Sequence, residues 1–157
     1  MPTRNQVILL ATLGSAALLG GAFGFQYIGG LAPCKLCLTA RWPHAAAILI
    51  GVIALVLTVA PWGRILPLLG ALAAASTSAV GVYHTGIERH WWAGPTTCSS
   101  QPIDGMATGD LLQQILNAPI VRCDEVAWSM WSLSMASWNA LLSAGLVLVW
   151  LWAARKS

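Results

Sequence analysis

The stretch AILIGVIALVLTVAPWGRILPLLGALAA, residues 47–74, decides the fold of this chain. It contains two apolar runs and a single charged residue, Arg64, between them. With the neighbouring apolar residues, each run approaches the roughly 20 residues that a helix needs to cross a bilayer. Only Pro61-Trp62-Gly63-Arg64 joins the runs, so the sequence predicts two antiparallel membrane helices connected by a tight turn.

The composition of the whole chain agrees with a membrane protein. Of its 157 residues, 57% are apolar and only 8% are charged, whereas a soluble domain carries roughly 25% charged residues. The mean hydropathy is +0.71. We therefore predict a single integral-membrane domain over 1–157, an all-α bundle of four transmembrane helices. The predicted spans are about 7–28, 44–60, 65–87 and 138–154.

The distribution of charge predicts the orientation of these spans. Four spans place both termini and the tight turn on one side, and loops 29–43 and 88–137 on the other. The first side carries four basic residues and no acidic residue, and the second carries four basic and all five acidic residues. Basic residues favour the cytoplasmic side, so we expect cytoplasmic termini and two outer loops. The net charge of +3 then reflects topology and does not indicate nucleic-acid binding.

All four cysteines fall in the predicted outer loops. Cys34 and Cys37 form a Cys-x-x-Cys in the first loop, and Cys98 and Cys123 enclose 24 residues in the second. The outer side of a membrane is where disulfides form and persist, but four cysteines allow three pairings. Spacing and compartment favour redox chemistry over two structural disulfides that brace the loops. Zinc is less favoured, because zinc sites commonly use two short Cys-x-x-Cys pairs, so no metal site is predicted.

The residues around Cys37 favour a reactive thiolate. Pro33 suits the first turn of a helix, so we expect a helical turn to begin near Cys34. Cys37 would then lie at a helix N-terminus, with Arg41 one turn further on the same face. Free backbone N–H groups and a nearby arginine both stabilise a thiolate. The alternative, if Arg41 is considered without Cys37, is an interfacial anchor whose charge lies among the lipid headgroups.

Two further features complete the candidate site. His84 lies near the outer end of the third span, and an ionisable residue within a span is a functional candidate by default. The alternative is an interfacial histidine bonded to a carbonyl group. His44 and His90 resemble boundary residues and receive no role. In the second loop, residues 108–117 include GDLLQQILN, whose apolar face predicts a short amphipathic helix on the membrane surface. Contact with the spans or with a partner is the alternative.

These motifs together resemble the DsbB family of quinone-dependent oxidases, which regenerate the periplasmic disulfide donor DsbA. The resemblance covers essentially the whole chain, with four spans and one cysteine pair in each outer loop. The segments that carry it are FQYIGGLAPCKLCLTAR, VYHTGIERHWWAGPTTC and RCDEVAWSMWSLSMASWNALL. It assigns the quinone-side histidine to His84, the family arginine to Arg41 and the partner-facing cysteine to Cys98.

The resemblance implies a location in the bacterial inner membrane with periplasmic loops, and a thiol:quinone oxidoreductase activity. A reduced DsbA-like thioredoxin-fold protein would attack Cys98 of a Cys98–Cys123 disulfide. Electrons would pass to Cys34–Cys37 through a transient Cys34–Cys123 link. Cys37 would then reduce a membrane quinone, ubiquinone or menaquinone, bound near the family arginine and histidine. The alternative from a different class is a structural four-span protein with two bracing disulfides.

Overall fold

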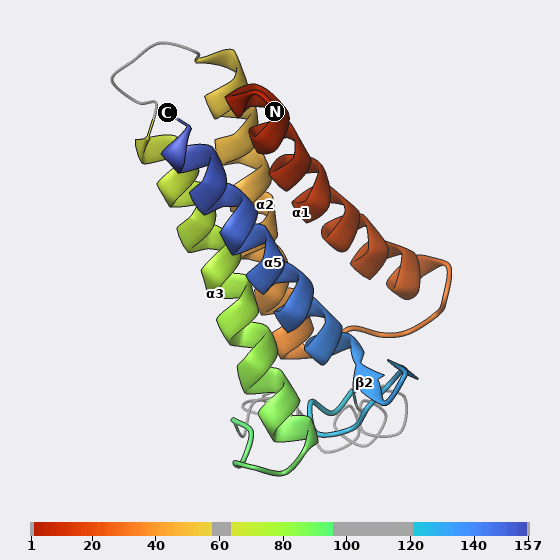
Figure 1. Ribbon diagram of the computed structural model, residues 1–157. Helices are drawn as coiled ribbons and strands as arrows, with labels where there is room; N and C mark the ends of the chain where they lie inside the picture. The colour runs from red at the N-terminus through yellow and green to blue at the C-terminus, as the bar shows by residue number, and fades with distance from the viewer. Residues whose placement is uncertain (1, 58–63, 96–120, 157) are drawn as a thin grey trace, which may run out of the picture.

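Four long helices form an antiparallel bundle in the computed structural model (Figure 1), which describes residues 2–57, 64–95 and 121–156. Each helix is long and apolar enough to cross a membrane, which confirms the predicted all-α bundle of four spans. The expected turn at Pro61 and the expected surface helix at 108–117 lie outside the described residues. The helices are α1 (Arg4–Tyr27), α2 (Lys35–Val56), α3 (Ile65–Glu88) and α5 (Met135–Arg155).

Side-chain caps determine where three of the helices begin. Thr3 and Gln6 form a capping box at the start of α1, in which each side chain satisfies a backbone N–H of the other residue. Cys34 caps α2 and Ser134 caps α5, each by accepting a hydrogen bond from a backbone N–H three residues on. Helix α2 therefore begins at Lys35, before the predicted span, and continues through Pro43.

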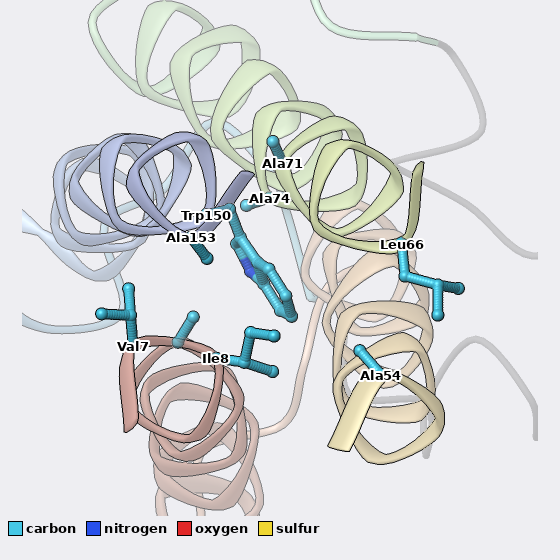
Figure 2. Packing of buried hydrophobic residues seen from close by; sticks show 9 residues of the cluster. Val7, Ile8, Ala54, Leu66, Ala71, Ala74, Trp150 and Ala153 are labelled. Atoms are coloured by element: carbon cyan, nitrogen blue, oxygen red, sulfur yellow. The ribbon is translucent and has the colours of Figure 1, made fainter. Parts of the chain in front are cut away.

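The helices pack unequally. Helix α3 makes extensive contacts with α2 and α5. Helix α1 makes fewer contacts with the same two helices, and it diverges from them toward its C-terminal end (Figure 1). Near the two termini, the fully buried ring of Trp150 lies among side chains from all four helices (Figure 2). This cluster closes one end of the bundle, and the divergence of α1 leaves the other end more open. The labelled side chains around Trp150 are Val7, Ile8, Ala54, Leu66, Ala71, Ala74 and Ala153.

Gly81→Ala is expected to destabilise the bundle by about 1–3 kcal/mol. The added Cβ would lie 2.9 Å from the backbone nitrogen of Ala140 and 3.0 Å from the carbonyl oxygen of Ala136. These backbone atoms cannot move aside alone, so α3 and α5 would have to separate. Unfolding in detergent micelles, followed by circular dichroism, measures the change. Gly20→Ala is the control, since no described atom lies within 4 Å of its new methyl group, and equal loss in both variants would contradict the prediction.

A short β-hairpin precedes α5, in a segment that the sequence placed only within the outer loop 88–137. Strands β1 (Ser129–Met130) and β2 (Leu133–Ser134) pair antiparallel, with Met130 opposite Leu133. The two connecting residues have φ of 52° and 62°, the left-handed backbone of a type I′ turn. They are Trp131 and Ser132, so the usual Asn-Gly signal of such a turn is absent from the sequence. The hairpin places Ser134 at the first turn of α5, facing the end of α3.

Candidate active site

The Cys-x-x-Cys pair lies at the N-terminus of α2, at the end of the bundle opposite the termini (Figure 1). The two Sγ atoms are 3.0 Å apart, and the Cys37 backbone N–H donates to Cys34 Sγ at 3.3 Å. Both residues are free thiols. The pair is therefore a closely spaced dithiol whose geometry follows directly from the helix cap.

The two thiols have different surroundings. Cys34 precedes the first residue of α2, and its hydrogen bond to Cys37 together with burial raises the pKa of the Cys34 thiol. Cys37 lies in the first turn, where backbone N–H groups and the helix dipole favour an anion. The Cys34 S–H points toward Cys37 Sγ. The arrangement thus favours a protonated Cys34 and a negatively charged Cys37.

The structure brings His84 to this dithiol from α3. His84 Nε2 lies 3.7 Å from Cys34 Sγ, and Nε2 and the two sulfur atoms all lie within 4.8 Å of one another. One helical turn on, Glu88 Oε1 is 3.8 Å from His84 Nε2, and the Ser134 hydroxyl donates to the other Glu88 oxygen. A buried polar chain therefore runs from the start of α5 to the two sulfur atoms.

Cys123 lies in the same buried cluster as Cys34. Only 2% of Cys123 is exposed, and the two cysteines pack with Ile87 at the end of α3. The backbone of Cys123 also lies beside the His84 ring. Three of the four predicted catalytic cysteines are thus gathered at one end of the bundle. The fourth, Cys98, lies outside the described residues.

Arg41 faces α1, and the guanidinium hydrogen bonds found in the described part of the chain all go to that helix. Its guanidinium donates to Gln26 Oε1 at 2.6 Å and to the Ala22 carbonyl oxygen at 3.3 Å. It also lies 4.7 Å from the centre of the Phe23 ring, within the range of a cation–π interaction. Arg41 therefore joins α2 to the diverging end of α1, and its expected role in holding the Cys37 thiolate stays a prediction.

A cavity of about 460 Å³ adjoins the dithiol and is lined by residues of all four helices. Its wall is mainly apolar, and its polar groups include Cys37, Arg41, His84 and His44. Such a mainly apolar cavity with a few convergent polar groups is the usual form of a small-molecule site. The cavity therefore fits a small, largely apolar ligand beside Cys37.

Sequence reasoning missed several polar residues of this site. His44, which the sequence placed at a span boundary without a role, is only 3% exposed, and its Nε2 bonds Asn139 Oδ1 at 2.9 Å. Glu88 and Ser134 were also overlooked. A polar side chain within an apolar span is a general signal of function, and it would have drawn attention to His44 and Asn139. The contact between Glu88 and Ser134 has no comparable local signal.

Together, the membrane helices and the buried dithiol beside a cavity define a membrane-embedded thiol oxidoreductase. The family model described as "Disulfide bond formation protein DsbB" matches residues 4–153. The chain belongs to this DsbB family, as a multi-pass membrane protein that forms disulfides.

Individual relatives agree with this assignment. The chain is 34% identical to disulfide bond formation protein B of Methylococcus capsulatus, over 93% of this chain and 91% of the relative. It is 26% identical to the protein of that name from Stutzerimonas stutzeri, over 94% and 93%. Disulfide bond formation protein B 2 of Pseudomonas syringae is 30% identical, over 91% and 83%. No solved structure gives a significant match.

Proposed function

We propose that this protein is a thiol:quinone oxidoreductase that reoxidises a DsbA-like dithiol protein and passes the electrons to a membrane quinone. The observation that carries this proposal is the position of the dithiol. Cys34, Cys37 and His84 lie within 4.8 Å of one another, and all three line the largely apolar cavity. A structural disulfide would need neither the histidine nor the cavity.

The first half of the reaction is disulfide exchange. A thiolate of the partner attacks Cys98 of the Cys98–Cys123 disulfide, which forms a mixed disulfide and releases the Cys123 thiolate. Cys123 then attacks Cys34 of the Cys34–Cys37 disulfide, and Cys37 leaves as a thiolate. The packing of Cys123 with Cys34 in one buried cluster supports this link.

Two further exchanges complete the transfer. The second partner thiol attacks the partner sulfur of the mixed disulfide, so the partner leaves oxidised and Cys98 is freed. Cys98 attacks Cys123, restores the loop disulfide and frees Cys34 as a thiol. The net result is one oxidised partner and one reduced Cys34–Cys37 pair.

The second half of the reaction closes the Cys34–Cys37 disulfide. A quinone bound in the cavity would accept the two electrons that this closure releases, together with the Cys34 proton and one proton from water. Cys37, at the helix N-terminus, is the sulfur that carries negative charge. His84 Nε2 lies 3.7 Å from Cys34 Sγ, where it can take the Cys34 proton as a general base. Glu88 Oε1 lies 3.8 Å from the same nitrogen, and the Ser134 hydroxyl donates to the other oxygen of this carboxyl group.

The same proposal places the dithiol end of the bundle on the periplasmic side of a bacterial inner membrane. Both chain ends lie at the opposite end of the bundle (Figure 1). The chain-end side carries the excess of basic residues, which favours the cytoplasm. The periplasm is also the compartment in which disulfides persist.

The test is direct oxidation of a dithiol partner by purified protein. Protein in detergent is mixed with a short-chain benzoquinone and an excess of a reduced thioredoxin-fold dithiol protein. We expect many equivalents of quinol per chain, measured by the change in ultraviolet absorbance. Reactions without the dithiol protein, or without this protein, are the controls. Quinol formation no faster than in these controls would refute the proposal.

Metal binding is the second candidate function, because Cys34, Cys37 and His84 could also act as metal ligands. Structural zinc sites have four protein ligands, and this cluster of described residues supplies three. Zinc analysis of the same preparation separates the two functions. One zinc per chain, together with no quinol formation, would favour metal binding.

A further inference from the structure

A second polar cluster lies deeper in the bundle than the dithiol. His44 of α2 hydrogen-bonds Asn139 of α5, with 2.9 Å between Nε2 and Oδ1. Asn139 Nδ2 donates to the carbonyl oxygen of Thr77 on α3, and also to its hydroxyl, at 3.3 Å each. The Thr77 hydroxyl in turn donates to the Ala40 carbonyl oxygen at 3.2 Å. The cluster joins three helices within the membrane-spanning region.

This network determines which nitrogen of His44 carries hydrogen. The Thr77 carbonyl oxygen can only accept, so the Asn139 atom that faces it is the donor Nδ2. Asn139 Oδ1 therefore faces His44 and also receives the Ser143 hydroxyl at 3.5 Å. Because Oδ1 can only accept, His44 Nε2 must be the protonated nitrogen. In a neutral imidazole the other nitrogen, Nδ1, is then an acceptor.

That second nitrogen has no partner among the described residues, and its residue lines the cavity. Nδ1 of His44 is buried and has no hydrogen-bond partner in the part of the chain that the structure describes. The residue is 97% buried, with 3% of its surface exposed, and it lines the same cavity as Cys37 and His84. His44 follows Cys37 by seven residues, which is about 10 Å along the helix axis. A buried acceptor without a donor destabilises the folded protein. We therefore expect Nδ1 to bind a ligand that donates a hydrogen bond.

We propose that Nδ1 of His44 accepts a hydrogen bond from a hydroxyl group of quinol, at the end of the cavity remote from Cys37. This inference rests on the proposed function, and it predicts that the cavity binds the reduced form of its ligand more tightly than the oxidised form. A quinone presents only carbonyl oxygens, which carry no hydrogen to donate and would oppose the lone pair of Nδ1. Quinol presents a hydroxyl at the same position. The fixed tautomer of His44 thus stabilises bound quinol relative to bound quinone. This difference favours the transfer of electrons from the dithiol to the quinone.

The test compares the affinities for quinone and quinol. Both are measured in a Cys37→Ser background, so that no electrons pass, with a short-chain benzoquinone and its hydroquinone under oxygen-free conditions. Quenching of tryptophan fluorescence reports binding. We expect the parent to bind quinol more tightly, and His44→Leu to reduce the ratio of the two affinities by about three- to tenfold.

Two further variants make the test specific. His44→Gln keeps an N–H that can donate to Asn139 and a carbonyl oxygen that can accept in place of Nδ1, so it should retain more of the preference for quinol than His44→Leu does. His90→Asn is the control, because His90 is exposed and has a φ of 56°, a backbone region that asparagine tolerates. It should leave the ratio unchanged.

The outcomes separate this inference from the proposed function. If the parent binds both ligands and His44→Leu keeps the same ratio, the role of His44 is refuted and the proposed function stands. Equal weakening of quinone and quinol would refute it in the same way. If the parent binds neither ligand, the quinone function itself fails.

Discussion

Cys37→Ser is expected to abolish the reduction of quinone by an added dithiol protein, with a loss on the order of a thousandfold or more. A serine hydroxyl is not ionised at neutral pH and cannot form the Cys34–Cys37 disulfide. The helix cap is retained, because the serine backbone N–H can still donate to Cys34 Sγ as that of Cys37 does at 3.3 Å. The variant should therefore insert and fold as the parent does.

The design separates loss of chemistry from loss of structure. The variant should still oxidise about one equivalent of partner protein through the Cys98–Cys123 disulfide, and then stop. Thr39→Ser, an exposed substitution in the same helical segment, is the control and should turn over normally. Measurements are quinol formation over time and trapping of the oxidised partner with an alkylating reagent. Repeated turnover by Cys37→Ser at the parental rate would disprove the electron path.

His84→Ala should lower the rate of dithiol oxidation by about a hundredfold or more, the usual contribution of a general base. Among the described residues, His84 supplies the imidazole that lies close to both sulfur atoms, with 3.7 Å between its Nε2 and Cys34 Sγ. Its removal leaves the Cys34 proton without an acceptor, so less of the dithiol is in the thiolate form. The alkylation of the dithiol by a small reagent should also slow, because the thiolate is the reactive species.

The alkylation measurement does not depend on quinone, so it tests His84 separately from the rest of the proposal. His90→Asn is again the matched control, since His90 is exposed and follows the end of α3. Both rates should be parental in the control. If His84→Ala leaves alkylation and turnover unchanged, His84 is an interfacial histidine without a catalytic role.

Much of the architecture was predictable because its signals are local. Each span is a continuous apolar run, and the need to satisfy backbone hydrogen bonds in lipid makes each run a helix. The start of α2 at the Cys-x-x-Cys was also predictable from Pro33 and the following turn. The β-hairpin was not, because Trp131 and Ser132 adopt positive φ without the glycine or asparagine that would normally mark the turn.

The candidate site was only partly predictable, since its contacts join residues that are distant along the chain. Cys34 meets His84 across 50 positions, and His44 meets Asn139 across 95. A pattern of single residues can mark each as polar within an apolar helix, but it carries no information about helix rotation. The direction of Arg41 shows the same limit, because its position one turn after Cys37 did not disclose its bonds to α1.

The sequence by itself determined four spans and the placement of reactive thiols at a helix start, because hydropathy and helix capping are properties of neighbouring residues. Tertiary structure alone decided which polar side chains share the buried space. It set His84 against the dithiol, gathered Cys123 with Cys34, and left one buried nitrogen of His44 without a partner among the described residues. The physical reason is that close packing between helices fixes their rotation, and rotation selects the side chains that face the interior.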